Sequence, residues 1–160
     1  MRATETPSSP HAQPAATQRR VDQLLAHYGE SHQHPTNERI HFVAIPMIML
    51  SLIGLIYSLH PWAAYAFVAA SMVYYVRLSA VFLVAMGLVT WLMLTIVHRL
   101  DAAGMLLAFS IAAFVVAWIF QFIGHKVEGK KPSFFEDIQY LWVGPLFVLS
   151  KLFVKLGIRW

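Results

Sequence analysis

Two short polar segments hold most of the side chains in this chain that could do chemistry. They cover residues 32–41 and 121–128, and each lies beside a long apolar run. Neutral imidazole binds Fe, Zn, Cu and Ni, and redox sites with open coordination positions are often built from two histidines and one carboxylate, or from histidines alone. Imidazoles and a carboxylate at the edges of a bilayer therefore predict a metal site that acts on an apolar substrate. The candidate ligands are His32, His41, His125 and, as a fourth, Glu128.

Two amide side chains accompany these candidates at helical spacing. Asn37 precedes His41 by four residues, and Gln121 precedes His125 by four, so each pair shares one face of a helix. Groups that surround a metal site commonly fix the tautomer of a histidine ligand or bind substrate oxygens. We expect the two amides to act in this way and not as ligands.

Each of these side chains also has an ordinary structural interpretation. A histidine at a membrane interface is usually solvated or hydrogen bonded, and only the clustering favours a ligand role. Glu128 follows Lys126 closely and is equally explained by a surface ion pair, which contributes little to stability. The role of His34 is left open, because it lies two residues from His32. The histidines predicted to be solvated are His11, His60 and His98.

The composition is that of a membrane protein. Of the 160 residues, 58% are hydrophobic and only 12% are charged, and the mean hydropathy is +0.58. A soluble domain carries about twice as many charged residues. Cysteine is absent, which excludes disulfides, thiolate metal ligands and cysteine nucleophiles. The net charge of +4 comes from Lys and Arg near the chain ends, so it fits an anionic bilayer leaflet and not nucleic-acid binding.

The chain divides into a tail and one domain. Residues 1–18 are predicted to be a disordered tail, because they are rich in Pro, Ser, Thr and Ala and contain no apolar run. Residues 19–160 are predicted to form a single membrane-embedded helical domain. It begins with an amphipathic surface helix over Arg19–Tyr28. A second helix is expected to start at Pro35, since proline suits the first helical turn, and to carry His41 into the bilayer edge.

About four apolar runs are predicted to span the membrane. Pro46 removes a helical hydrogen bond in the first run and predicts a kink there. A polar turn is expected at residues 98–101, and the last apolar stretch, residues 134–160, is expected to lie along the interface or to enter the membrane only partly. The predicted fold class is therefore all-α, an integral membrane helical bundle with about four transmembrane helices plus interfacial helices. The predicted spans are Phe42–Leu59, Trp62–Val76, Leu78–Val97 and Met105–Gly124.

The positive-inside rule predicts the orientation of this multi-pass protein. With a cytoplasmic N-terminal arm, four spans put the basic loop around Lys126, Lys130 and Lys131 on the same side as the basic C-terminus. The two polar segments then share that side and can converge, although His41 and His125 are more than eighty residues apart in the sequence. We expect both termini and the metal site on the cytoplasmic face, of the inner membrane in a bacterium or of the endoplasmic reticulum in a eukaryote.

A pattern that matches a known family is carried by residues 28–37, His41, Pro46, 121–125, Glu128, Pro132 and 144–147. With these residues, the chain resembles the Mpo-type family of small membrane proteins from about residue 23 to residue 156. Fungal members of that family are iron(II)-dependent dioxygenases of the endoplasmic reticulum that shorten 2-hydroxy fatty acids by one carbon during phytosphingosine breakdown. The resemblance implies such a dioxygenase here, with Fe(II) as cofactor and with O2 and a long-chain 2-hydroxy fatty acid as substrates of fatty acid α-oxidation.

The resemblance also implies roles for single residues. His34 falls where the family pattern requires no histidine. The chain departs from the pattern at Glu128, because fungal members have one more residue between the histidine of the second segment and its glutamate. Glu128 is therefore a weaker ligand candidate than the histidines. The implied iron-binding or catalytic residues are His32, His41 and His125, and the implied neighbours are Tyr28, Asn37 and Gln121.

Chemistry and resemblance together predict a mechanism. The carboxylate and hydroxyl of a 2-hydroxy fatty acid would chelate Fe(II), O2 would take a remaining position, and carbon–carbon cleavage would release CO2. The loop lysines are candidates to attract the head group. Other functions stay open: a non-enzymatic membrane adaptor, or a small metal or proton transporter, although residues 78–97 and 105–120 lack the ionisable groups that a transporter needs. A haem carrier is disfavoured, since its histidines face each other within helices. Besides the lipid bilayer, no macromolecular partner is indicated.

Overall fold

The computed structural model describes residues 19–129 and 140–160, and every regular element in these ranges is a helix. The predicted all-α fold is therefore confirmed. The expected tail, residues 1–18, and the lysines at 130 and 131 lie outside the described residues. The described helices are α1 (Arg20–Gly29), α2 (Pro35–Leu59), α3 (Pro61–Val76), α4 (Ala80–Ala102), α5 (Leu106–Glu128) and α7 (Val143–Leu156).

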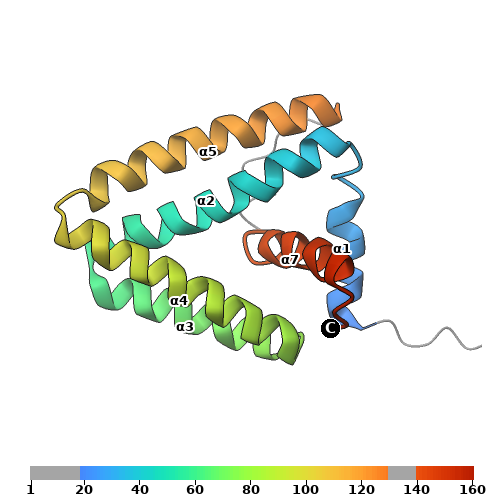
Figure 1. Cartoon of the computed structure of the whole chain (residues 1–160), viewed down its shortest axis with the longest axis horizontal. Helices are drawn as coiled ribbons and strands as arrows, with labels where there is room; N and C mark the ends of the chain where they lie inside the picture. The colour runs from blue at the N-terminus through green and yellow to red at the C-terminus, as the bar shows by residue number, and fades with distance from the viewer. Residues whose placement is uncertain (1–18, 130–139) are drawn as a thin grey trace, which may run out of the picture.

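The four long helices form two pairs that meet at one end (Figure 1). α2 packs mainly against α5, and α3 packs against α4. The connections from α2 to α3 and from α4 to α5 lie where the pairs meet, and the pairs diverge toward the other end. α7 lies between the diverging pairs and contacts both α2 and α4, while α1 packs on α7. The open end of the bundle is therefore filled by the first and last described helices.

Three helices, α2, α4 and α5, are long and apolar enough to cross a membrane. The run predicted as the second span forms α3, whose 16 residues reach about 24 Å at 1.5 Å per residue, short of the ~30 Å hydrocarbon core. The predicted integral membrane bundle thus has three full-length candidate spans and one shorter apolar helix. Large apolar side chains remain exposed on α4 and α5, as expected of lipid-facing surfaces: Val84, Leu88, Trp91, Val115 and Ile119.

Two predicted boundaries are wrong. Residues 98–101 do not form a turn, because α4 continues to Ala102 and the chain turns at Gly104, which has φ +67°. Lys126 does not belong to a loop, because α5 continues to Glu128 and ends at Gly129, with φ +74°. Glycine adopts this left-handed conformation without the steric penalty of other residues, so it ends helices. Both helices continue through their polar residues, because the last turn of a membrane helix can extend into water and carry polar side chains there.

The start of α2 and the end of α5 bring the two polar segments together. Helix α2 runs without interruption through Pro46, and α5 lies alongside it (Figure 1). The basic residues Arg39, Lys126 and Lys151 also belong to this end, where Lys151 pairs with Glu38 at 3.1 Å. The cytoplasmic orientation of this end stays a prediction.

Small residues let α2 and α5 approach closely. A Cβ atom on Gly54 would overlap the Ser110 hydroxyl, and a Cβ atom on Gly124 would overlap Oδ1 of Asn37. Close backbone approach through small residues is typical of helix pairs in membranes, where packing and not water exclusion drives association. Gly124 directly precedes His125, so this approach sets the separation of the histidines on the two helices.

Candidate metal centre

Three imidazoles from different elements meet at the open end of the bundle. His32 follows α1, His41 lies in the second turn of α2, and His125 lies in the last turn of α5. One ring nitrogen from each lies within 4.8 Å of the other two. The three residues are 4%, 0% and 6% exposed, respectively. The predicted convergence of the two polar segments is therefore present in the structure, and the spacing suits a single ion shared by all three rings.

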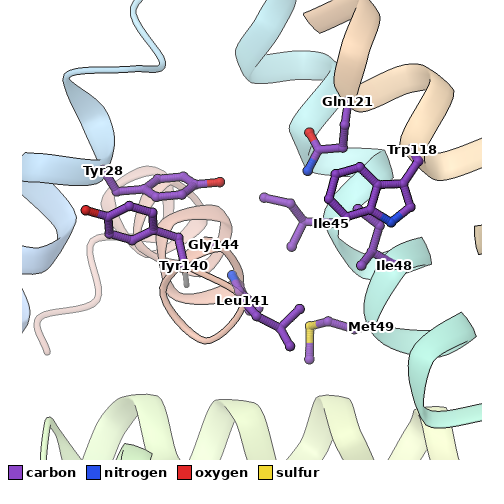
Figure 2. A pocket seen from close by; sticks show the side chains of 10 residues that line it. Tyr28, Ile45, Ile48, Met49, Trp118, Gln121, Tyr140, Leu141 and Gly144 are labelled. Carbon is purple, nitrogen blue, oxygen red and sulfur yellow. The ribbon is translucent and has the colours of Figure 1, made fainter. Parts of the chain in front are cut away.

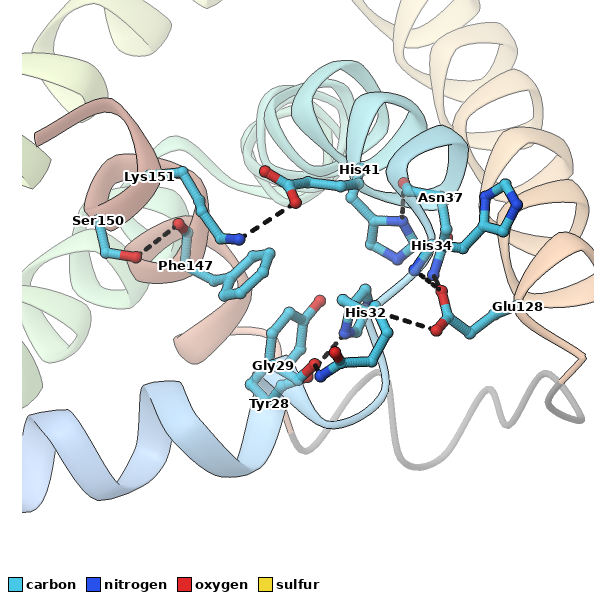
Figure 3. Close-up of polar contacts among 12 residues, drawn as sticks. Tyr28, Gly29, His32, His34, Asn37, His41, Glu128, Phe147, Ser150 and Lys151 are labelled. Carbon is cyan, nitrogen blue, oxygen red and sulfur yellow. Dashed lines mark hydrogen bonds and ion pairs between the residues drawn. The ribbon is translucent and has the colours of Figure 1, made fainter. Parts of the chain in front are cut away.

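Backbone carbonyls set the orientation of two of these rings. Nδ1 of His32 lies 2.7 Å from the carbonyl oxygen of Tyr28, and Nδ1 of His41 lies 2.9 Å from that of Asn37 (Figure 3). A carbonyl only accepts hydrogen bonds, so Nδ1 donates in both cases and Nε2 carries the lone pair. This is how proteins usually prepare histidine for a metal.

The burial of His41 tests whether these residues fit a metal. Its Nε2 is buried and has no hydrogen-bond partner among the described residues. A buried acceptor left without a partner costs about 1–3 kcal/mol, so native proteins seldom keep one without a ligand for it. Coordination would satisfy this nitrogen. Three neutral nitrogen ligands suit Fe(II), and they leave coordination positions for a substrate.

Aromatic rings hold His32 although it lies outside a helix. The ring of Tyr28 stacks on it, with centroids 4.2 Å apart and planes 12° from parallel. Phe147 of α7 packs against the same imidazole at 5.5 Å and against Tyr28 at 5.1 Å. The position of His32 therefore depends on α1 and α7 together. The sequence predicted no role for Phe147, and its only signal was that residues 144–147 are among those that carry the family resemblance.

Glu128 holds the loop that carries His32 and does not join the three-histidine group. Its two carboxylate oxygens accept hydrogen bonds from the backbone N–H groups of Gln33 and His34, at 2.8 and 2.9 Å. Nδ2 of Asn37 donates to the same carboxylate at 2.9 Å (Figure 3). These donors lie at the start of α2, where a negative charge is favourable. These hydrogen bonds indicate a positioning role for Glu128, and its role as a metal ligand stays a prediction.

The two amides predicted to surround the site do lie beside it. Asn37 supplies the carbonyl that orients His41 and bonds to Glu128, and so connects the first polar segment to the second. Gln121 lies one turn before His125 and is 4% exposed. Its Oε1 is buried without a hydrogen-bond partner among the described residues. Figure 2 shows this side chain among the residues that line a cavity.

The other described histidines do not join the group. His34 caps α2, and its Nδ1 accepts a hydrogen bond from the N–H of Thr36 at 3.1 Å. His60 ends α2 at the opposite end of the bundle and is exposed. His98 is exposed and bonds through Nε2 to the hydroxyl of Tyr65 at 2.8 Å. His11 lies outside the described residues.

An open groove adjoins the site on the side of α1 and α7. It has a volume of about 540 Å³, and His32, Phe147 and Lys151 line it together. The ammonium of Lys151 lies 5.1 Å from the centre of the Phe147 ring and pairs with Glu38. Sequence reasoning missed this cation near the histidines, because only the docking of α7 brings it there.

We expect Glu128→Gln to weaken iron binding about ten- to a hundredfold, the usual effect of losing a group that orients metal ligands. The amide keeps the size of the carboxylate but turns an N–H₂ group toward N–H donors, so the loop before α2 loses an acceptor. Iron affinity measured by competition with a chelator checks this. Asp101→Asn, an exposed acid at the far end of the bundle, is the matched control. Complete loss of iron at full folding would instead indicate a direct ligand.

Comparison with known proteins identifies the family of this chain. The family model described as 2-hydroxy-palmitic acid dioxygenase Mpo1-like matches residues 18–156. The 2-hydroxy-palmitic acid dioxygenase MPO1 of Saccharomyces cerevisiae is 27% identical over 143 residues, which cover 83% of this chain and 79% of the yeast protein. No solved structure matches the chain. Because the family model covers most of the chain, including all three histidines, this protein belongs to the 2-hydroxy-palmitic acid dioxygenase Mpo1-like family.

Proposed function

We propose that this protein is an iron(II)-dependent dioxygenase that shortens long-chain 2-hydroxy fatty acids by one carbon. The observation that carries the proposal is the buried group of His32, His41 and His125 at one end of a membrane bundle. The yeast relative is named for 2-hydroxy-palmitic acid, which supports the substrate class. A site at the end of apolar helices suits a substrate with a polar head and a long apolar tail.

The proposed reaction balances without a further reductant. One 2-hydroxy fatty acid and one O2 give the fatty acid that is one carbon shorter, one CO2 and one water. The bond between the carboxyl carbon and the hydroxyl-bearing carbon breaks. The two carbons together lose four electrons, and O2 gains the same four. No second organic substrate is needed.

Held by His32, His41 and His125, Fe(II) would supply the Lewis acidity and the redox chemistry that this oxidation needs. The protein would supply three neutral ligands on separate elements, so the bound ion would keep its positive charge until the substrate carboxylate binds and partly neutralises it. The carbonyls of Tyr28 and Asn37 hold two of the rings in the correct tautomer. Glu128 accepts hydrogen bonds from the loop before α2 and so keeps His32 in place.

Charge near the groove supports binding of an acidic head group. Lys151 lines the groove together with His32 and is paired with Glu38. A cation at this position raises the local concentration of carboxylates. Lys126, which the sequence suggested for this purpose, is exposed on α5. We propose Lys151 as the residue that attracts the head group.

The substrate test uses two acids that differ by one hydroxyl. Protein purified without oxygen and loaded with Fe(II) is incubated with O2 and 2-hydroxypalmitate, and we expect pentadecanoate and CO2. Palmitate should be inert, because it lacks the hydroxyl that completes the chelate. Mass spectrometry of the products and O2 uptake check this. Equal consumption of palmitate would contradict chelation through the hydroxyl, and no turnover of either acid by iron-loaded protein would contradict the dioxygenase.

A further inference from the structure

We propose that the acyl chain of the substrate lies inside the bundle, in an apolar cavity between α2, α5 and α7, and that Met49 and Leu141 determine the longest chain accepted. This inference rests on the proposed function. It assigns a binding site and a determinant of chain length to residues that have no role in holding the metal.

The cavity begins one helical turn below the histidines. On α2, Ile45 and Ile48 follow His41 by four and seven residues and line the cavity. On α5, Gln121 and Trp118 precede His125 by four and seven residues and line the cavity on the same side as the α2 residues (Figure 2). Residues at these spacings lie on one face of a helix. The two faces that carry the histidines therefore continue directly as the walls of the cavity.

The polar groups of the cavity gather at its end nearest the histidines. Tyr28, whose ring stacks on His32, lines the cavity together with Gln121 (Figure 2). Oε1 of Gln121 is buried without a partner among the described residues, so it can accept a hydrogen bond from a ligand hydroxyl. The remaining walls are mostly apolar, from Ile45, Ile48, Trp118 and Leu141. A polar entrance and apolar walls match a 2-hydroxy acid whose chain points inward.

A second apolar cavity continues in the same direction. Met49 and Leu141 line both cavities, so their side chains form the wall between them. Ile53 lines the second cavity and lies twelve residues beyond His41 on α2, about 18 Å at 1.5 Å per residue. The far side includes Ser71 and Trp142, joined by a hydrogen bond of 2.9 Å from the indole N–H to the hydroxyl. The distance along α2 from His41 to Ile53 is therefore similar to the length of an extended long-chain acyl group.

The cavities are narrow before a ligand binds. Their volumes are about 30 Å³ and about 20 Å³, each close to the space of one water molecule. A chain must therefore displace the side chains of Met49 and Leu141. Methionine is unbranched and adapts easily to a new neighbour, and the chain would replace the lost apolar contacts. The ease of this displacement then limits the length of chain that binds.

The open groove between α1 and α7 is a poorer site for the chain. Gln33, Glu38 and Lys151 line it, so methylenes placed there would meet charged and polar groups and stay in contact with water. Apolar surface gains free energy only when it leaves water. The groove suits the approach of the head group, and the enclosed cavity suits the chain.

Substitutions at the shared wall test the effect on chain length. We expect Met49→Ala to shift the preferred substrate to longer 2-hydroxy acids, with kcat/KM gaining about fourfold for each extra methylene buried. Met49→Trp should shift it to shorter acids. Val43→Trp is the matched control on the same helix, because Val43 is 57% exposed. The profile is measured with a series of saturated 2-hydroxy acids. Unchanged profiles for both Met49 variants would overturn the inference.

A cross-linking experiment separates this inference from the proposed function. A 2-hydroxypalmitate analogue with a diazirine at the end of its chain is activated on the full-length protein, both metal-free and loaded with Fe(II) without oxygen. We expect peptides with Met49 or Leu141 to be labelled, and excess 2-hydroxypalmitate to prevent it. Labelling of Leu25 or Val154 in the groove, or labelling that is not prevented, would overturn the cavity site even if turnover occurs. Labelling of the cavity without turnover would support the site and contradict the dioxygenase.

Discussion

Single replacement of His32, His41 or His125 by alanine is expected to abolish iron retention and, with it, all turnover. Each residue contributes one of three nitrogens that lie within 4.8 Å of one another. Two remaining imidazoles cannot compete with buffer and chelators for Fe(II). Iron content after purification without oxygen, measured per chain by elemental analysis, checks this. We expect iron near one per chain in the unchanged protein and none in the three variants.

The stability of the metal-free variants distinguishes a metal site from a structural one. Nε2 of His41 is buried without a partner among the described residues, which opposes folding of the metal-free protein. His41→Leu should therefore leave Tm unchanged or raise it, although iron is lost. A large fall in Tm would show that the imidazole stabilises the fold without a metal. Control variants are His60→Ala and His98→Ala, which should keep iron, and loss of iron from them would contradict the assignment.

A larger side chain at Gly124 is expected to disrupt the site without changing any ligand. A Cβ atom there would overlap Oδ1 of Asn37 and would lie 3.4 Å from both His41 and Ile40. Gly124→Val must therefore push α5 away from α2 and separate His125 from His41. Overpacking of this kind costs about 1–3 kcal/mol, so Tm should fall together with iron content. Iron analysis and thermal unfolding check both effects.

Gly87 provides the matched control for this substitution. It lies in the interior of α4, and a Cβ atom there would meet nothing within 4 Å. Gly87→Val should keep iron and activity, and Gly87→Ala should stabilise the helix by up to about 1 kcal/mol, because alanine has the higher helix propensity. If Gly124→Val retained iron as well as Gly87→Val does, close approach of the helices would not set the site.

Sequence alone determined the class of the protein and the local geometry of the candidate site. High hydrophobicity and low charge indicated a membrane bundle, and the structure contains three helices that can span a bilayer. Helical periodicity placed Asn37 with His41 and Gln121 with His125, because residues four apart share a face in any α-helix. These features depend only on residues within a single helix. They can therefore be predicted without knowing how the helices pack.

Only the tertiary structure decided what lies opposite each face. Spacing along α5 puts Glu128 on the same helix face as His125. In the folded protein, the carboxylate of Glu128 accepts hydrogen bonds from the N–H groups of Gln33 and His34. Likewise, Phe147 and Lys151 come close to His32 only because α7 packs on α1. Distances between helices follow from the fit of many side chains that are remote in sequence. At a close contact such as Gly124, one added methyl group would already overlap a side chain of the neighbouring helix. Spacing within a helix therefore predicts candidates, and packing between helices selects which of them meet.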